Sequence, residues 1–389
     1  MITEGYKKAE GKAFHIPGPD HDHVFVSSAR HLSEIRKAKR HELSMFGATK
    51  QMFQPAYTML GHNWLDERGA EGVGYVRAVG TLFPKQLMEI MPDVERIVQE
   101  SFDSFAEQHR SREGYLNLPA YEMHKTILSE DETFMKSIFK YNEIVINAAE
   151  VLRLVPSCLK WIIGPLVGRT QSVQTIVFDG IHRVVSCRLE AKRRAKAGEC
   201  VAAPSNDMIQ WIIDTAPKDL GWGPRRITYE IIAIWFGSVH ALSASITFAL
   251  FDLCDHPEYI DPLRKEAEGP DFDVFLNTTK GLPLLDSFIK ESARINPIES
   301  MAGRRQALKE FSLSDGTVIR KGDWACVPVK AIQSDGTYFP RPDGFFGFRF
   351  VPRDMLPNNT DTVSQPEGPS SYSDISDHYY SWGVGGIIW

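Results

Sequence analysis

Hydrophobic positions recur every three or four residues along most of the chain between residues 82 and 296. The segments 83–109 and 141–156 show this spacing clearly, and it is typical of helices that bury one face. Later the spacing changes to alternation, and residues 307–329 contain an Asp-Gly pair between two strand-like runs, which predicts a hairpin. A long helical region followed by a small β region predicts a mainly α (α+β) fold rather than a doubly wound sheet.

We expect residues 1–389 to form a single domain, because no linker-like stretch interrupts the pattern. The predicted regions are a β and helix region at 12–45, a helical region at 82–296, a β-rich, arginine-containing segment at 297–350 and coil at 351–389.

Residues 231–250 contain no Asp, Glu, Lys or Arg, and a helix of this length can cross a bilayer. Its serines, threonine and histidine make it more polar than an ordinary membrane span. We interpret it as a long helix buried in a large core, with a membrane-spanning helix as the alternative.

The charge and the cysteines exclude several classes of function. Lys and Arg number 44 against 50 Asp and Glu, and this net charge of −6 argues against nucleic acid as a partner. The basic stretch 188–198 is interpreted as a solvated helix face. None of the five cysteines forms a C-x-x-C pair, which argues against zinc and disulfide frameworks and for a reducing compartment. The Asp-His repeat at 20–23 is interpreted as a loop rather than a metal site.

A Glu-x-x-Arg pattern, Glu291 and Arg294, lies near the end of a predicted helix. Three-residue spacing places the two side chains on one face, close enough to pair. The pattern alone says little, because residues 150–153 and 190–193 repeat it, and a surface ion pair is the simplest interpretation of each.

The order of the later motifs makes this copy different from the others. Arg304 and Arg305 come next, then the predicted hairpin, then Arg349 within an aromatic stretch, and last the Trp-Gly-Val-Gly-Gly run at 382–386. This succession resembles the C-terminal half of a cytochrome P-450, a haem-thiolate monooxygenase, particularly the fungal members. The resemblance covers about residues 12–386.

The resemblance implies a structural triad of Glu291, Arg294 and Arg349. Paired carboxylate and guanidinium groups can hold a loop rigidly when they are buried. Arg304, or its neighbour Arg305, would contact a haem propionate; a solvated basic turn is the alternative for this pair.

Residues 231–250 would then be the long helix that crosses the haem face. Gly237, with Ser238, would open a groove for dioxygen. His240 would occupy the acid position of a proton relay, a role that histidine can perform near neutral pH. Ser243 would supply a hydroxyl to the same relay.

Two positions depart from the family pattern in this part of the chain. Ala241 stands where threonine is usual, so Ser243 or Ser245 would have to act through water; packing within the helix is the alternative for both serines. Arg77 matches the helix arginine that touches the other propionate, but Val73 replaces the usual tryptophan.

The resemblance ends at the glycine turn. Gly383 and Gly385 match the turn that presents the haem-ligating cysteine, but the cysteine position falls on Trp389, and no cysteine follows Cys326. Since the cysteine is missing, we expect no metal ligand from this chain. The thiolate ligand promotes O–O cleavage, so we also expect little or no activity. The chain also starts without the apolar anchor of microsomal members, so we expect a truncated product or an incomplete gene model.

The implied function is hydroxylation of an apolar small molecule in fungal secondary metabolism, with haem as the cofactor and electrons from an NADPH-dependent reductase. The family resides at the endoplasmic reticulum membrane. Without the anchor we expect a cytoplasmic or peripheral membrane protein that contacts the membrane near Leu159–Val167. The alternatives are a haem-free ligand-binding protein or pseudoenzyme fragment, and a membrane protein that spans at 231–250.

Overall fold

The computed structural model describes residues 1–62, 64, 74–110, 132–167, 172–217, 221–278, 280–357, 363, 370–374 and 378–381. The chain divides into two compact units. The first unit consists of Met1–Thr49 and Ala244–Trp389, and the second of Lys50–Ser243. Helices dominate the described residues and the strands are few and short, so the predicted mainly α fold is confirmed. The single domain expected from the sequence stays a prediction.

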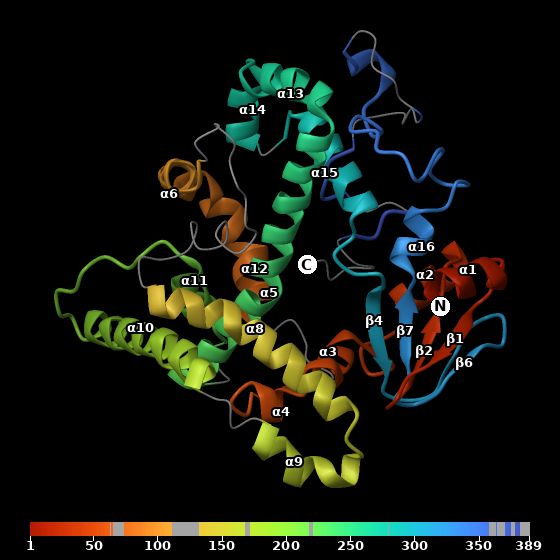
Figure 1. Ribbon diagram of the computed structural model, residues 1–389. Coiled ribbons are helices and arrows are strands. Elements are labelled where there is room, and N and C mark those ends of the chain that lie inside the picture. The colour runs from red at the N-terminus through yellow and green to blue at the C-terminus, as the bar shows by residue number, and fades with distance from the viewer. Residues whose placement is uncertain are drawn as a thin grey trace. The chain divides into compact units, whose positions relative to one another are not determined.

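The first unit contains a five-stranded sheet in the order β1-β2-β7-β4-β3 (Figure 1). β2 and β7 pair in parallel, and the other neighbours pair antiparallel. Strands from the two ends of the chain therefore share one sheet. The strands are β1 (Phe14–Pro17), β2 (Asp22–Phe25), β3 (Leu43–Ser44), β4 (Ala302–Ala307) and β7 (Trp324–Val327).

The predicted hairpin forms a separate two-stranded sheet of β5 (Phe311–Ser312) and β6 (Val318–Ile319). Its strands are joined by the Asp-Gly turn, and Gly316 has a φ of +88° that disfavours any residue with a Cβ. The Asp-Gly signal therefore located the turn correctly.

Two helices of the first unit begin at residues that are typical of helix N-termini. Ser28 caps α2 by accepting a hydrogen bond from the His31 amide (3.3 Å), and Pro283 stands in the first turn of α15. The helices of this unit are α1 (Ile2–Ala9), α2 (Ala29–Lys37), α13 (Ile260–Ala267), α14 (Asp271–Thr278), α15 (Pro283–Ile295) and α16 (Val329–Gln333). Short 3-10 turns occur at Pro257–Tyr259 and Arg353–Met355.

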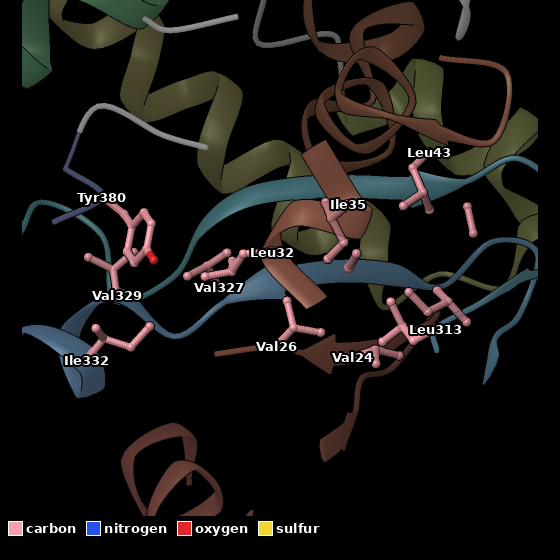
Figure 2. Close-up of a cluster of buried hydrophobic side chains, with 13 residues drawn as sticks. Val24, Val26, Leu32, Ile35, Leu43, Leu313, Val327, Val329, Ile332 and Tyr380 are labelled. Atoms are coloured by element: carbon pink, nitrogen blue, oxygen red, sulfur yellow. The ribbon is translucent and has the colours of Figure 1, made fainter. Parts of the chain in front are cut away.

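One hydrophobic cluster packs the sheet against α2 and α16 (Figure 2). Val24 of β2, Val327 of β7 and Leu32 of α2 are among its members. Tyr380 belongs to the same cluster and lies at one end of it, beside Val329. The chain just before the glycine-rich terminus is thus part of the core of the first unit.

The second unit is helical throughout the residues that the structure describes. In it α8 packs along α10, and α5 packs on α6 and α11. Its helices are α4 (Pro55–Thr58), α5 (Gly74–Thr81), α6 (Phe83–His109), α8 (Glu132–Arg153), α9 (Lys160–Val167), α10 (Ser172–Lys196) and α11 (Met208–Thr215), with a 3-10 turn at Ser157–Leu159. Pro165 lies inside α9, although a proline ordinarily interrupts a helix.

Two helices continue from one unit to the other, α3 (Met45–Phe53) and α12 (Pro224–Asp255). Residues 227–232 of α12 are buried, whereas most of the described residues after them are half-buried or exposed. The expectation of a buried helix therefore holds for the first part only. Among the described residues α12 is also the one helix that could cross a membrane by length and composition. Glu230, buried within it, pairs with Arg226 at 2.7 Å.

Candidate functional site

Helix α15 carries Glu291 and Arg294 on its buried side. Apolar residues of the same helix, Leu284 and Phe288, pack into a cluster with Tyr259 and neighbouring aromatic residues. This packing turns the Glu-x-x-Arg face toward the interior of the first unit. The local sequence therefore produces a buried ion pair because apolar residues share that face of the helix.

The structure brings Glu291, Arg294 and Arg349 together. Arg294 binds the carboxylate through two parallel bonds, Nε to Oε2 at 2.7 Å and a terminal nitrogen to Oε1 at 2.8 Å. Arg349 Nε donates to Oε2 at 2.9 Å, and the Phe346 amide donates to Oε1 at 3.0 Å. All three charged side chains are 0–1% exposed, so this is a desolvated two-guanidinium, one-carboxylate network.

The remaining guanidinium protons bind backbone carbonyls. Arg294 donates to Gln333 O at 2.8 Å and to Pro342 O at 2.7 Å. Arg349 donates to Pro340 O at 2.7 Å. Burial lowers the pKa of Arg349 while Glu291 raises it, and an arginine stays protonated either way. The network therefore ties α15 to the end of α16 and to the loop at 340–349.

The two repeats of the pattern lie at the surface. The Glu150 side chain is 58% exposed and pairs with Arg153 at 3.0 Å, whereas Glu190 and Arg193 are 59% and 76% exposed. Exposed pairs of this kind contribute little to stability. Burial, not spacing, distinguishes the copy at 291–294.

Arg304 lies on β4 in the first unit. Its guanidinium is largely buried, with 21% of the side chain exposed, and pairs with Glu299 at 2.8 Å. Arg305, the alternative to Arg304, is the next residue on the same strand. Burial lowers the pKa of Arg305, and the positive charge of Arg40 lowers it further. The partner of Arg304, Glu299, is half exposed.

The predicted relay residues lie on α12. Gly237 follows Phe236, whose carbonyl accepts a hydrogen bond from Asn142 of α8 at 3.1 Å. His240 is helical, but its side chain lies outside the described residues, and Ser243 is half-buried. Further along the helix, Ser245 accepts a hydrogen bond from the Tyr372 hydroxyl at 3.3 Å. Ser245 is therefore already engaged within the first unit.

Several predicted positions cannot be compared with the structure. Arg77 lies in α5, but its side chain is outside the described residues. Val73, Gly383, Gly385 and Trp389 lie outside them altogether. These assignments stay predictions.

One buried charged residue was missed at the sequence level. Lys290 is 1% exposed and directly precedes Glu291 on α15. The signal was available, because Ser287, Lys290 and Arg294 recur at three- and four-residue spacing on the face that carries the network. A lysine on this buried face of the helix indicates that a polar group lies nearby in the interior to accept its hydrogen bonds.

The cysteines provide no evident metal ligand. Cys326 is buried in β7, and burial raises the pKa of its thiol to about 12. The other four are exposed: Cys158, Cys187, Cys200 and Cys254. Among the described residues no group of three or more His, Cys, Asp or Glu side chains could hold a metal ion.

Comparisons with known proteins agree with this arrangement. The cytochrome P450 family model matches residues 3–366. The cytochrome P450 monooxygenase AtmP of Aspergillus flavus is 26% identical over 363 residues, which cover 91% of this chain and 70% of AtmP. The cytochrome P450 monooxygenase paxP of Penicillium paxilli is 26% identical, with 90% of this chain and 70% of paxP covered.

The fold is also similar to that of a solved structure, the retinoic acid bound cyanobacterial CYP120A1. The TM-score is 0.67 at 15% identity, and the match covers 98% of this chain and 81% of that chain. The resemblance to fungal cytochromes P-450 that the motif order indicated is confirmed. The family model matches well over half of the residues of this chain, and the chain therefore belongs to the cytochrome P450 family.

Proposed function

We propose that this chain is the framework of a haem-dependent monooxygenase that hydroxylates an apolar small molecule in secondary metabolism. The family implies haem, a redox partner and a small-molecule substrate, and its fungal members named above are monooxygenases. For this chain we propose an NADPH-dependent reductase as the redox partner. Haem, when bound, supplies the oxygen chemistry, and the protein supplies the binding site and its orientation.

The buried network around Glu291 carries this proposal. Charges in a dry interior are costly unless every hydrogen bond is made. Here Glu291 accepts four hydrogen bonds of 2.7–3.0 Å. A site that binds a cofactor needs a rigid support of this kind for its first contacts.

The described residues fit haem only in part. Arg304 offers a largely buried guanidinium whose partner Glu299 could give way to a propionate. No cysteine fits as the thiolate, because Cys326 is a protonated thiol within the sheet and the other four lie at the surface. The described residues therefore do not complete a haem-thiolate site.

We further propose a peripheral position on the endoplasmic reticulum membrane, with α9 as the contact. Trp161 is 70% exposed, Leu166 56% and Ile162 46%, all within one short helix. Trp and aliphatic side chains at this density favour the interface between headgroups and acyl chains. Leu154, between α8 and the 3-10 turn that precedes α9, is 74% exposed.

A haem titration of the purified 389-residue chain tests the proposed function. We expect saturable binding of one haem, and we expect Arg304→Ala to weaken it about tenfold, the effect of losing roughly one charge-assisted hydrogen bond. Arg320→Ala is the matched control, because Arg320 is an exposed arginine of the same unit, and its haem affinity should equal that of the wild type.

Two outcomes would count against the proposal. Equal haem affinity for the wild type and Arg304→Ala would remove Arg304 from the site. A chain that binds no haem but binds apolar ligands would instead support the alternative, a haem-free ligand-binding protein.

A further inference from the structure

Lys290 is enclosed by residues that approach from a distant part of the chain. Its ammonium donates to Ser370 Oγ at 2.5 Å and to Ser371 O at 3.1 Å. The nitrogen also lies 5.1 Å from the ring centroid of Phe350 and 4.8 Å from that of Tyr379. These hydrogen bonds and ring contacts together place Lys290 between α15 and two short segments, residues 370–374 and 378–381.

Other contacts fix the same short segment to the first unit. Asp286, one turn before Lys290 on α15, accepts a hydrogen bond from the Tyr372 amide at 3.0 Å. The Ser371 amide donates to Asp374 at 2.8 Å, which closes a turn within the segment. Lys290 is therefore the central contact of a small set that holds residues 370–374 against α15.

Residues 378–381 are held separately and shortly precede the glycine-rich sequence at 383–386. Tyr379 and Tyr380 are 1% and 0% exposed, and Gln333 donates to Ser381 Oγ at 3.1 Å. Lys290 contacts Tyr379 as well as the segment at 370–374, so it links both anchors across residues 375–377.

We propose that Lys290 is a positioning residue that clasps residues 370–374 and Tyr379 to α15 and so sets the path of the chain that leads toward the glycine-rich sequence at 383–386. The setting of this path rests on the proposed function; the clasp itself does not. Lys290 touches neither substrate nor cofactor in this account, and it acts through the backbone that it fixes.

The burial of Lys290 makes the stability of the clasp depend on pH. Burial lowers its pKa to about 8, although Asp374 and Asp286 act in the opposite direction. In an opened segment the lysine regains water and its ordinary pKa of about 10.5, so protonation favours opening. The clasp therefore gains stability as pH rises from about 8 toward 10.5. Burial raises the pKa of Tyr372 and of Tyr379, which keeps both side chains neutral in this window.

Chymotrypsin cleavage after Tyr372, measured from pH 7 to 9.5, tests the clasp without haem or activity. Each rate is divided by that of a tyrosine reference peptide at the same pH. When opening is fast relative to cleavage, the normalised rate follows the open population. We expect a flat profile below pH 8 and a fall that approaches tenfold per pH unit above it, the limit for one linked proton.

Variants separate the clasp from general packing. Lys290→Met removes the proton, and Lys290→Arg keeps a charge that does not titrate, so both should give flat profiles above pH 8. Lys330→Met is the matched control, because Lys330 also donates to an α15 carbonyl, that of Ile295, and should retain the wild-type profile. A flat wild-type profile, or a fall that persists in Lys290→Met, would overturn the proposal. Failure of the haem titration would leave this result unchanged.

Discussion

At the scale of single residues, Glu291 accepts bonds from two guanidinium groups and one amide and has no exposed surface. Replacing one member of such a network leaves buried charges without compensation, and the cost is far larger than for an exposed pair. The sequence contains three copies of the same spacing, and the spacing alone does not distinguish the buried copy from the other two. That information comes from Phe288 and the residues that pack around it.

Glu291→Gln should lower the free energy of unfolding by about 3–5 kcal/mol, because Arg294 and Arg349 then remain charged in a dry interior. Glu190→Gln removes the acid of an exposed pair with the same spacing and should cost about 0.5 kcal/mol or less. Urea unfolding monitored by circular dichroism measures both values. Similar losses for the two variants would contradict the importance of the buried network.

At the scale of elements, helices with long apolar periodicity were predictable from sequence, and so was the Asp-Gly hairpin. The sheet was not, because β2 pairs with β7 across about three hundred residues, and strands of two to six residues leave little local signal. The helix α9 was missed for a different reason: Pro165 stands inside it, where proline ordinarily indicates a break.

The exposed apolar face of α9 gives a prediction about membrane association. Trp161→Glu should weaken binding to vesicles of phosphatidylcholine and phosphatidylinositol by about tenfold or more, because burial of a large aromatic side chain is replaced by the desolvation of a charge. Flotation of the purified chain with vesicles measures this effect. The control is Ile176→Glu, the same kind of change at a 41% exposed residue of α10. Equal flotation of both variants and the wild type would exclude α9 as the contact.

At the scale of the whole molecule, the order of the motifs predicted the family. Several motifs that lie far apart in the sequence match the family pattern in the same order, which is more specific than any one of them. The detailed site was less predictable. Arg304 and the Glu291 network lie in the first unit, whereas Gly237 and His240 belong to the second. The spacing of residues within one helix does not predict which side chains from different parts of the chain come together. The family pattern includes Glu291 but not Lys290, so the contacts of Lys290 become evident only in the structure.

The central claim is that residues 1–389 form a cytochrome P450 framework in which no cysteine is placed as the haem thiolate. The reduced carbon-monoxide difference spectrum of the haem-loaded chain tests it most directly. We predict no thiolate-type Soret shift for the wild type, a shift for Trp389→Cys, where the family pattern places the ligand, and none for Ile387→Cys, two positions away. A full thiolate-type shift from the wild-type chain would contradict the claim.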